Sequence, residues 1–291
     1  MIDSIMEKIL KFLFDMFKGG TETFLDMITD LFQKSIDTVQ TNVSETPTEF
    51  SQTIVDNLRI ISDTAILPVA GLILTYVFCY ELYQIVVDKN RGGDFDTQQV
   101  MFLIIKTGAM ILLLSNAFTI TLAVFDLGKW ITDHVPASTL KLPDSITQNL
   151  LDSMEEGDVG AALSMWVVAA IALIASFAMS IIIYLVAWSR MVAIMLYISV
   201  APIPFATFLN RDWVGSIGQA YAKNLLALML QGYFMLVCLV VYAGLLEKAS
   251  SLMATEGTGL FGLMLMLVSM AILVVSLTRT HSLAKSVVGA I

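Results

Sequence analysis

The residues of this chain that could do chemistry are few and widely separated. His134 and His281 are the only two histidines, and no cluster of His, Cys and carboxylate residues has the spacing of a metal site. Gly257-Thr258-Gly259 lacks the following Lys and the preceding strand of a phosphate-binding loop. Cys79 and Cys238 lie inside apolar runs, where a thiol behaves as a small hydrophobic group. The sequence therefore predicts no enzyme, no cofactor, no metal and no disulfide.

Two charged residues stand inside long apolar runs, where ionic chemistry is expensive. Glu81 lies about six residues before the end of one run and Lys106 about six after the start of the next. At about 1.5 Å per helical residue, both would lie roughly 9 Å below the same membrane interface. We expect a Glu81–Lys106 ion pair, because charges within a span normally find a partner or an aqueous cavity. The alternative is that each side chain extends separately to the interface.

Arg190 and two nearby prolines mark another segment that is unusual for a membrane span. Arg190 is embedded in the longest apolar stretch, so it either caps a tight hairpin at an interface or points into an interior shared by subunits. Pro202 and Pro204 cannot continue a regular helix, because proline lacks the N–H and clashes with the preceding turn. A helix break at membrane depth requires protein or water to receive the freed carbonyls. This segment is the best candidate for a cavity or a helix crossing.

The elements that carry these residues must be membrane helices. The chain has 291 residues, of which 57% are hydrophobic and 14% charged, against about 25% charged in ordinary soluble domains. The mean hydropathy is +0.80. Six apolar runs are long enough to cross a bilayer: 66–87, 100–125, 165–188, 191–209, 221–246 and 259–277. The predicted fold is all-α, a polytopic integral membrane bundle with five or six spans.

The first 65 residues are too charged to span. Apolar residues recur at helical spacing from Ile2 to Phe17 and again from Phe24 to Val39, with charged residues opposite them. Gly19-Gly20 is expected to break this pattern into two helices. The region 1–65 is therefore predicted to hold amphipathic helices, which form either a collar on the membrane surface or an arm that binds a partner.

Three further segments follow from the pattern of spans. We expect a two-span hairpin over 66–125, a central loop over 126–164 with a short helix between Asp144 and Met154, and core membrane helices with a Pro-broken segment over 165–291. If 165–209 crosses only once, the positive-inside rule is better satisfied and the central loop is extracytoplasmic. The two sides then carry these basic residues: Lys89, Arg91, Lys106, Arg211, Lys223, Arg279 and Lys285 against Lys129, Lys141 and Lys248. We favour this five-crossing arrangement.

Polar residues within the spans are candidates for contacts between helices. Asn116, Asn224 and Gln231 can hydrogen-bond across a helix interface, and small residues from Ala169 to Ser180 let a neighbouring helix approach closely. These contacts either pack one subunit or join several copies. The net charge of −9 excludes a broad basic surface for tight nucleic-acid binding, so any contact with nucleic acid is expected to be transient.

One segment resembles a known family. The run RMVAIMLYISVAPIPFATFLNRDWVGSIGQAYAKNLLALMLQGYFM begins at Arg190 and holds an Arg-bearing span, an Ala-Pro break, a Trp in a short loop and a Gln-Gly pair in a long span. Arg190, Ala201-Pro202, Trp213 and Gln231-Gly232 match features of the TrbL-type family, the polytopic inner-membrane subunits of conjugative type IV secretion systems. The likeness extends over about 66–285.

The resemblance implies a subunit of the membrane channel for DNA and protein transfer between cells. It further implies a homo-oligomer in the inner membrane that assembles with a transfer ATPase and other subunits, with transient contact to translocating DNA. Two other functions stay open from the residues alone. Buried charges and a broken helix also fit a small-solute transporter or ion channel, and the absence of catalytic motifs fits a membrane scaffold or immunity-type protein.

Overall fold

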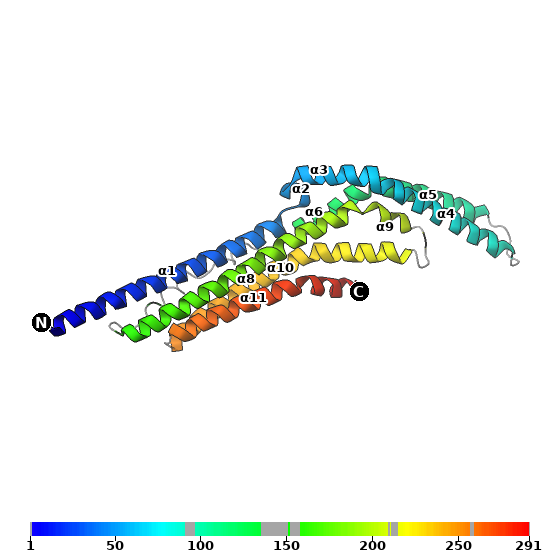
Figure 1. Cartoon of the computed structure of the whole chain (residues 1–291). Coiled ribbons are helices and arrows are strands. Elements are labelled where there is room, and N and C mark those ends of the chain that lie inside the picture. Colours follow the sequence, from blue (N-terminus) through cyan, green and yellow to red (C-terminus); the bar gives the residue numbers. More distant parts are fainter. Residues whose placement is uncertain are drawn as a thin grey trace. The chain divides into compact units, whose positions relative to one another are not determined.

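The computed structural model describes residues 2–90, 97–134, 151, 158–208, 210, 215–256 and 259–290. Within these ranges the chain is helical and has no strand, which confirms the all-α prediction (Figure 1). The larger helices are α1 (Ile2–Ser44), α4 (Leu67–Asn90), α5 (Thr97–Ser115), α6 (Ala117–Asp133), α8 (Val159–Ser199), α10 (Gly215–Glu256) and α11 (Gly259–Val288). Shorter elements are α2 (Pro47–Phe50), α3 (Gln52–Ile61), the π-helical turn η1 (Ser62–Ile66) and α9 (Pro202–Thr207).

The chain forms two compact units. Unit 1 comprises Met1–Val43, Val135–Trp188 and Phe234–Thr280. Unit 2 comprises Ser44–His134, Ser189–Tyr233 and His281–Ile291. Helices α8, α10 and α11 therefore contribute residues to both units.

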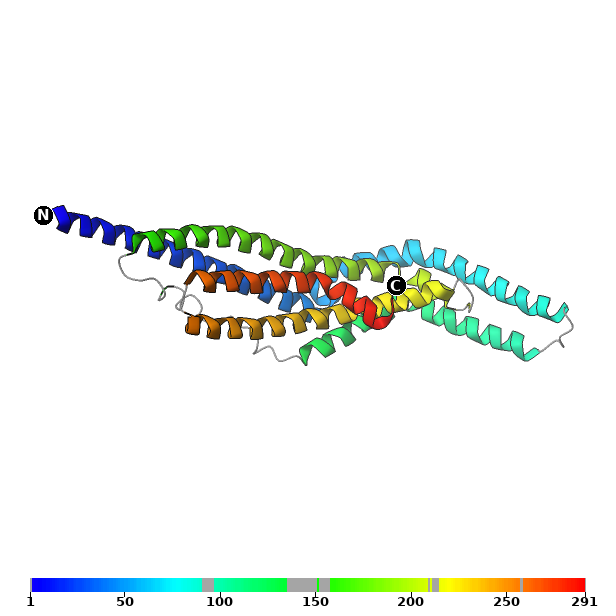
Figure 2. The ribbon, with the colours of Figure 1, turned by 90° about the horizontal axis from the view of Figure 1, so that it is seen from below.

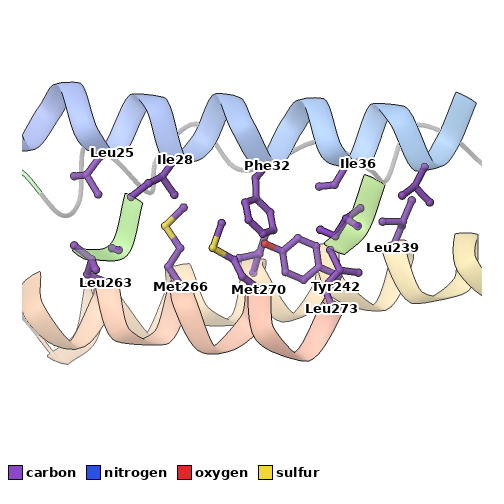
Figure 3. Close-up of a cluster of buried hydrophobic side chains, with 14 of the residues drawn as sticks. Leu25, Ile28, Phe32, Ile36, Leu239, Tyr242, Leu263, Met266, Met270 and Leu273 are labelled. Atoms are coloured by element: carbon purple, nitrogen blue, oxygen red, sulfur yellow. The ribbon is translucent and has the colours of Figure 1, made fainter. Parts of the chain in front are cut away.

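Unit 1 is a bundle in which α1 lies alongside α8, α10 and α11 (Figure 1, Figure 2). The apolar stripe of α1 is buried in the core with side chains of the other three helices, and Figure 3 shows Leu25, Ile28, Phe32 and Ile36 pointing into it. Phe32 contacts Tyr242 with their ring centroids 6.2 Å apart. The apolar face of α1 is thus covered by protein. The membrane-surface collar is therefore wrong for α1, because this face is not available for insertion among lipid headgroups.

Helix α1 runs without interruption through Gly19-Gly20, so the expected break there is wrong. Glycine in a helix interior costs only about 1 kcal/mol relative to alanine, which packing can offset. A Cβ added at Gly20 would lie 2.6 Å from the indole nitrogen of Trp166, so the missing side chain makes room for this ring. Phe17 and Phe24 flank the same indole, with centroid distances of 6.0 and 5.7 Å. Gly20 therefore serves close helix packing.

Five helical stretches are long and apolar enough to cross a membrane: Gln52–Val87, Gln98–Ser115, Val159–Ser199, Gly215–Lys248 and Phe261–Val288. The predicted span 165–188 and the first part of 191–209, as far as Ser199, are joined in the single helix α8, in agreement with the five-crossing arrangement. Helix α3, which follows Pro47 and α2, continues through η1 into the first span. The chain is therefore a multi-pass membrane protein.

The predicted span 100–125 is interrupted at Asn116, which separates α5 from α6. The Asn116 backbone N–H donates to the Leu113 carbonyl, and its side-chain amide donates to the Leu112 carbonyl at 2.8 Å. Asparagine side chains compete in this way with the regular helical pattern. The candidate span accordingly ends at Ser115. The short helix predicted between Asp144 and Met154 lies outside the described residues, apart from Leu151.

Candidate functional site

The backbone of unit 2 is irregular where α8 ends and α9 begins. Pro202 has no N–H to give to the Ile198 carbonyl, which instead accepts from Ala201 at 3.3 Å. Ile203 likewise donates to the Val200 carbonyl at 3.2 Å, one residue short of the α-helical pattern. These shorter steps end α8 at Ser199 and start α9 at Pro202. The predicted Pro-driven break is therefore present, and both Pro202 and Pro204 are buried.

The break releases the carbonyl of Tyr197, because Ala201 has turned its N–H to Ile198. The hydroxyl of Tyr221, on α10, donates to this carbonyl at 2.9 Å. The two tyrosine rings are stacked with a centroid distance of 5.6 Å, and Phe205 meets Tyr221 edge-on at 6.3 Å. A buried carbonyl without a partner is costly in a protein interior. Tyr221 therefore stabilises the break from a neighbouring helix.

Two glycines let the start of α10 approach α9 closely. A Cβ at Gly218 would lie 2.9 Å from the Pro204 carbonyl oxygen and 3.0 Å from Oγ1 of Thr207. A Cβ at Gly215 would collide with the backbone carbonyl of Asn210. Backbone atoms cannot move aside as a flexible side chain can. Gly218 thus follows from the close approach of the α9 and α10 backbones, and Gly215 from the close approach of the Asn210 backbone.

Helix α9, which follows the break, also packs against the hairpin of α4 and α5. Ala206, Ile203, Phe205 and Phe208 pack against an apolar cluster from the hairpin, whose buried members are Ala70, Leu74, Val77, Met110 and Leu114. Helix α9 contacts both α4 and α5. The short helix is therefore a packing element between the hairpin and α10, and the break determines its direction.

Arg190 lies nine residues before the end of α8, and only 6% of its surface is exposed. The hairpin-cap interpretation is wrong, since the helix continues for nine residues beyond it to Ser199. The apolar residues of the same helix that follow it, Ile194 and Ile198, belong to the core of unit 2. The structure thus places this guanidinium inside the protein.

Gln231 forms a polar contact between two spans. Its side chain is 5% exposed, and its Oε1 lies 3.2 Å from Nδ1 of His281 on α11, which donates in the Nδ1–H tautomer. Gly232 beside it is also buried. Asn116 and Asn224, by contrast, donate their side-chain amides to carbonyls of the preceding turn. Of these three predicted side-chain amides, Gln231 has a described hydrogen bond to another helix, and Asn116 and Asn224 have described hydrogen bonds within their own chain segment.

Glu81 and Lys106 line the same groove between α4 and α5. This groove has a volume of about 670 Å³, and its other lining residues include Gln98, Gln99 and Phe102. The structure thus brings both predicted charges to one open cavity, although a direct ion pair between them stays a prediction. Trp213 lies outside the described residues.

An ion pair that sequence reasoning did not identify joins Glu49 to Lys129, outside the candidate spans. The Lys129 ammonium donates to the Glu49 carboxylate, and the Thr46 backbone N–H donates to the same carboxylate at 2.9 Å. These donors lower the pKa of Glu49, and the hydrogen bond to Glu49 raises the pKa of Lys129. The interaction ties α2 to α6 within unit 2.

The residues that complete the break were not among the predicted site residues. Tyr221, Tyr197 and Gly218 had only weak signals, a polar aromatic within or beside an apolar run and a glycine within a helix. Nothing local indicates that Tyr221 reaches a carbonyl 24 residues earlier. Among the described residues, no group of three or more His, Cys, Asp or Glu side chains could hold a metal.

Comparisons with known proteins agree with this architecture. A family model described as TrbL/VirB6 plasmid conjugal transfer like protein matches residues 32–202, more than half of the 291-residue chain. The match starts within α1 and ends at Pro202, so it includes Arg190 and Ala201-Pro202 but not Trp213 or Gln231-Gly232. No curated protein and no solved structure matches the chain. The chain belongs to the family of TrbL/VirB6 plasmid conjugal transfer like proteins.

Proposed function

We propose that this protein is a channel subunit of a conjugative type IV secretion machine. The family match over residues 32–202 carries this proposal, since membership implies a component of conjugal transfer. The Pro202 and Pro204 break fits a subunit whose helices cross closely, because its freed carbonyl is received by the Tyr221 hydroxyl of a neighbouring helix. Catalysis has no part in the proposed role.

The proposed assembly is a homo-oligomer in the inner membrane. Its partners are the lipid bilayer, a transfer ATPase that supplies energy, and other subunits of the machine. Contact with translocating DNA is transient, in keeping with the net charge of −9. Arg190, Pro202, Pro204 and Trp213 organise the break and the subunit interface.

Two further contacts are proposed to hold the spans in register. Glu81 and Lys106 would interact within their groove, directly or through water. Gln231 bonds His281 between α10 and α11, and the adjacent Gly232 allows close packing. Within this arrangement the central segment 126–164, whose first residues belong to α6 and whose last residues belong to α8, is extracytoplasmic. Cysteine labelling between Ser145 and Ser153 from the cytoplasmic side alone would contradict that orientation.

The decisive test is an in-frame deletion of the gene in a donor strain. We expect conjugative transfer to be lost while growth is unaffected, and transfer to be restored by the wild-type gene in trans. Unchanged transfer frequency in the deletion strain would refute the proposal. Neighbouring genes for a transfer ATPase and a relaxase would independently support it.

A small-solute transporter is distinguished by a second measurement. The purified chain would be reconstituted alone into liposomes and assayed for flux of ions and small solutes. A secretion subunit that acts only with its partners is expected to give no flux above empty liposomes. Sustained, saturable flux of one solute together with normal conjugation in the deletion strain would favour the transporter.

A further inference from the structure

Helix α11 identifies the part of unit 1 that lies at membrane depth. Residues 261–278 of α11 contain no charged side chain, and Arg279 follows them directly and is exposed. At about 1.5 Å per residue this stretch is roughly 27 Å long, close to the hydrocarbon thickness of a bilayer. It belongs entirely to unit 1 and to one of the five candidate spans. If α11 crosses the membrane, it crosses with these residues.

Helix α1 packs along this same stretch. Leu25, Ile28, Phe32 and Ile36 of α1 are at most 3% exposed and belong to the same core as Leu263, Met266, Met270 and Leu273 of α11. Figure 3 shows the two sets facing each other in the same order along the helices, from Leu25 near Leu263 to Ile36 near Leu273. Residues 25–36 of α1 therefore lie at the same membrane depth as the charge-free part of α11.

The opposite face of α1 is charged at this depth. The residues concerned are exposed and fall, at about 100° per residue, within roughly a third of the helix circumference: Glu22, Asp26, Asp30, Lys34 and Asp37. Asp30 and Lys34 form an ion pair of 2.7 Å, yet their side chains are still 62% and 64% exposed. Four carboxylates and one ammonium give this face an acidic character.

The surroundings of this charged face are apolar. Asp30 stands at the rim of a groove of about 480 Å³ whose other walls come from apolar residues of α1 and α8, including Ile174 and Phe177. Ile174 is 72% exposed and Phe177 56% exposed, as expected for side chains that meet lipid. Ionised side chains do not face hydrocarbon, and at membrane depth they face a protein interior or a water-filled cavity.

We infer that the charged face of α1 lines a water-filled space enclosed by several copies of this chain. One chain leaves the face open, and the homo-oligomer proposed above supplies the further copies that complete the enclosure. This inference rests on the proposed conduit function and adds which helix forms the aqueous wall. Because the wall is acidic, it favours cations over anions in the space beside it.

The inference can be tested by cysteine accessibility in the full chain. Cys79→Ser and Cys238→Ser remove the native thiols, and Asp30→Cys or, separately, Asp26→Cys introduces a probe on the charged face. Val268→Cys is the matched control, since Val268 lies near the middle of the charge-free stretch of α11 and is 43% exposed. Intact membrane vesicles are treated with a membrane-impermeant trimethylammonium methanethiosulfonate, and the remaining thiols are counted after denaturation.

We expect the Asp30 and Asp26 cysteines to react at least about tenfold faster than the Val268 cysteine, because the thiolate forms readily in water and not in hydrocarbon. Equal rates would overturn the inference. If the α1 cysteine and the Val268 cysteine both react slowly, no water reaches α1. If both react fast, unit 1 lies outside the bilayer. Both probe positions are on the exposed face, so either variant serves if the other fails to fold.

The same strains separate this inference from the proposed function. If deletion abolishes transfer while the α1 cysteines stay unlabelled, the conduit function stands and the aqueous wall of α1 is refuted. If the α1 cysteines react rapidly while deletion leaves transfer unchanged, α1 faces water in a protein with another function.

Discussion

The two units of this protein differ in how regular their helices are. In unit 1 the described parts of α1, α8, α10 and α11 run without interruption and bury an apolar core. In unit 2 the helical path contains the π-helical turn at Ser62–Ile66, the interruption at Asn116 and the proline break before α9. Regular helices satisfy their own backbone, whereas the proline break leaves the Tyr197 carbonyl to the Tyr221 hydroxyl of another helix. Unit 1 therefore depends mainly on side-chain packing, and unit 2 depends in addition on particular polar and close contacts.

The largest effect is expected in the core of unit 1. Phe32→Ala should lower the free energy of unfolding by about 3 to 5 kcal/mol, because it leaves a cavity where Phe32 is fully buried. Thermal unfolding of the purified protein in detergent measures this loss. Phe12→Ala on the same helix is the control, since Phe12 is 67% exposed and should have little effect. Equal effects of the two substitutions would show that α1 does not pack as described.

A second substitution compares the two units within one helix. Gly218→Ala in unit 2 should cost about 1 to 3 kcal/mol, because its Cβ would press on the Pro204 carbonyl. Gly244→Ala in unit 1 meets no atom within 4 Å and should be neutral or stabilise α10 by up to about 1 kcal/mol. Unfolding midpoints in one detergent measure both. A stabilising Gly218→Ala would contradict the close approach of α9 and α10.

The third prediction isolates the hydrogen bond at the break. Tyr221→Phe keeps the stacked ring but leaves the Tyr197 carbonyl without its donor, which should cost about 1 to 2 kcal/mol. Tyr83→Phe is the matched control, because Tyr83 is 64% exposed. Transfer frequency should fall with Tyr221→Phe more than with Tyr83→Phe if the break serves the conduit. Identical stability of both variants would show that the hydroxyl does not support the break.

The smallest effect concerns pH. The pKa of Glu49 is lowered in the folded protein, so its contribution to stability is present above the ordinary carboxylate pKa and is lost as pH falls through the lowered value. Between about pH 7 and pH 3 the midpoint of thermal unfolding should thus fall more in wild type than in Glu49→Gln. The difference should be small, since an exposed ion pair contributes little to stability. Parallel pH profiles would mean that the pair with Lys129 adds nothing to unit 2.

The features that could be predicted from sequence depend on nearby residues. Spans follow from the length of apolar runs, and the break follows from two prolines that lack N–H groups. The break expected at Gly19-Gly20 is absent because Gly20 packs against Trp166, which is distant in sequence. Tyr221 was missed for the same reason, since its partner is a backbone carbonyl on another helix. Local composition predicts where a helix is weak, but only tertiary contacts decide whether it breaks and what receives the freed groups.

The hydrogen bond between Tyr221 and Tyr197 has a consequence for biosynthesis. The ribosome makes Tyr197 24 residues before Tyr221, so the nascent α8 reaches the insertion machinery with the Tyr197 carbonyl unsatisfied by its own helix. Lipid offers no donor, and the partner arrives only when α10 emerges. We therefore expect α8 to stay at the insertion site until α10 joins it, so that the two helices enter the bilayer as a pair.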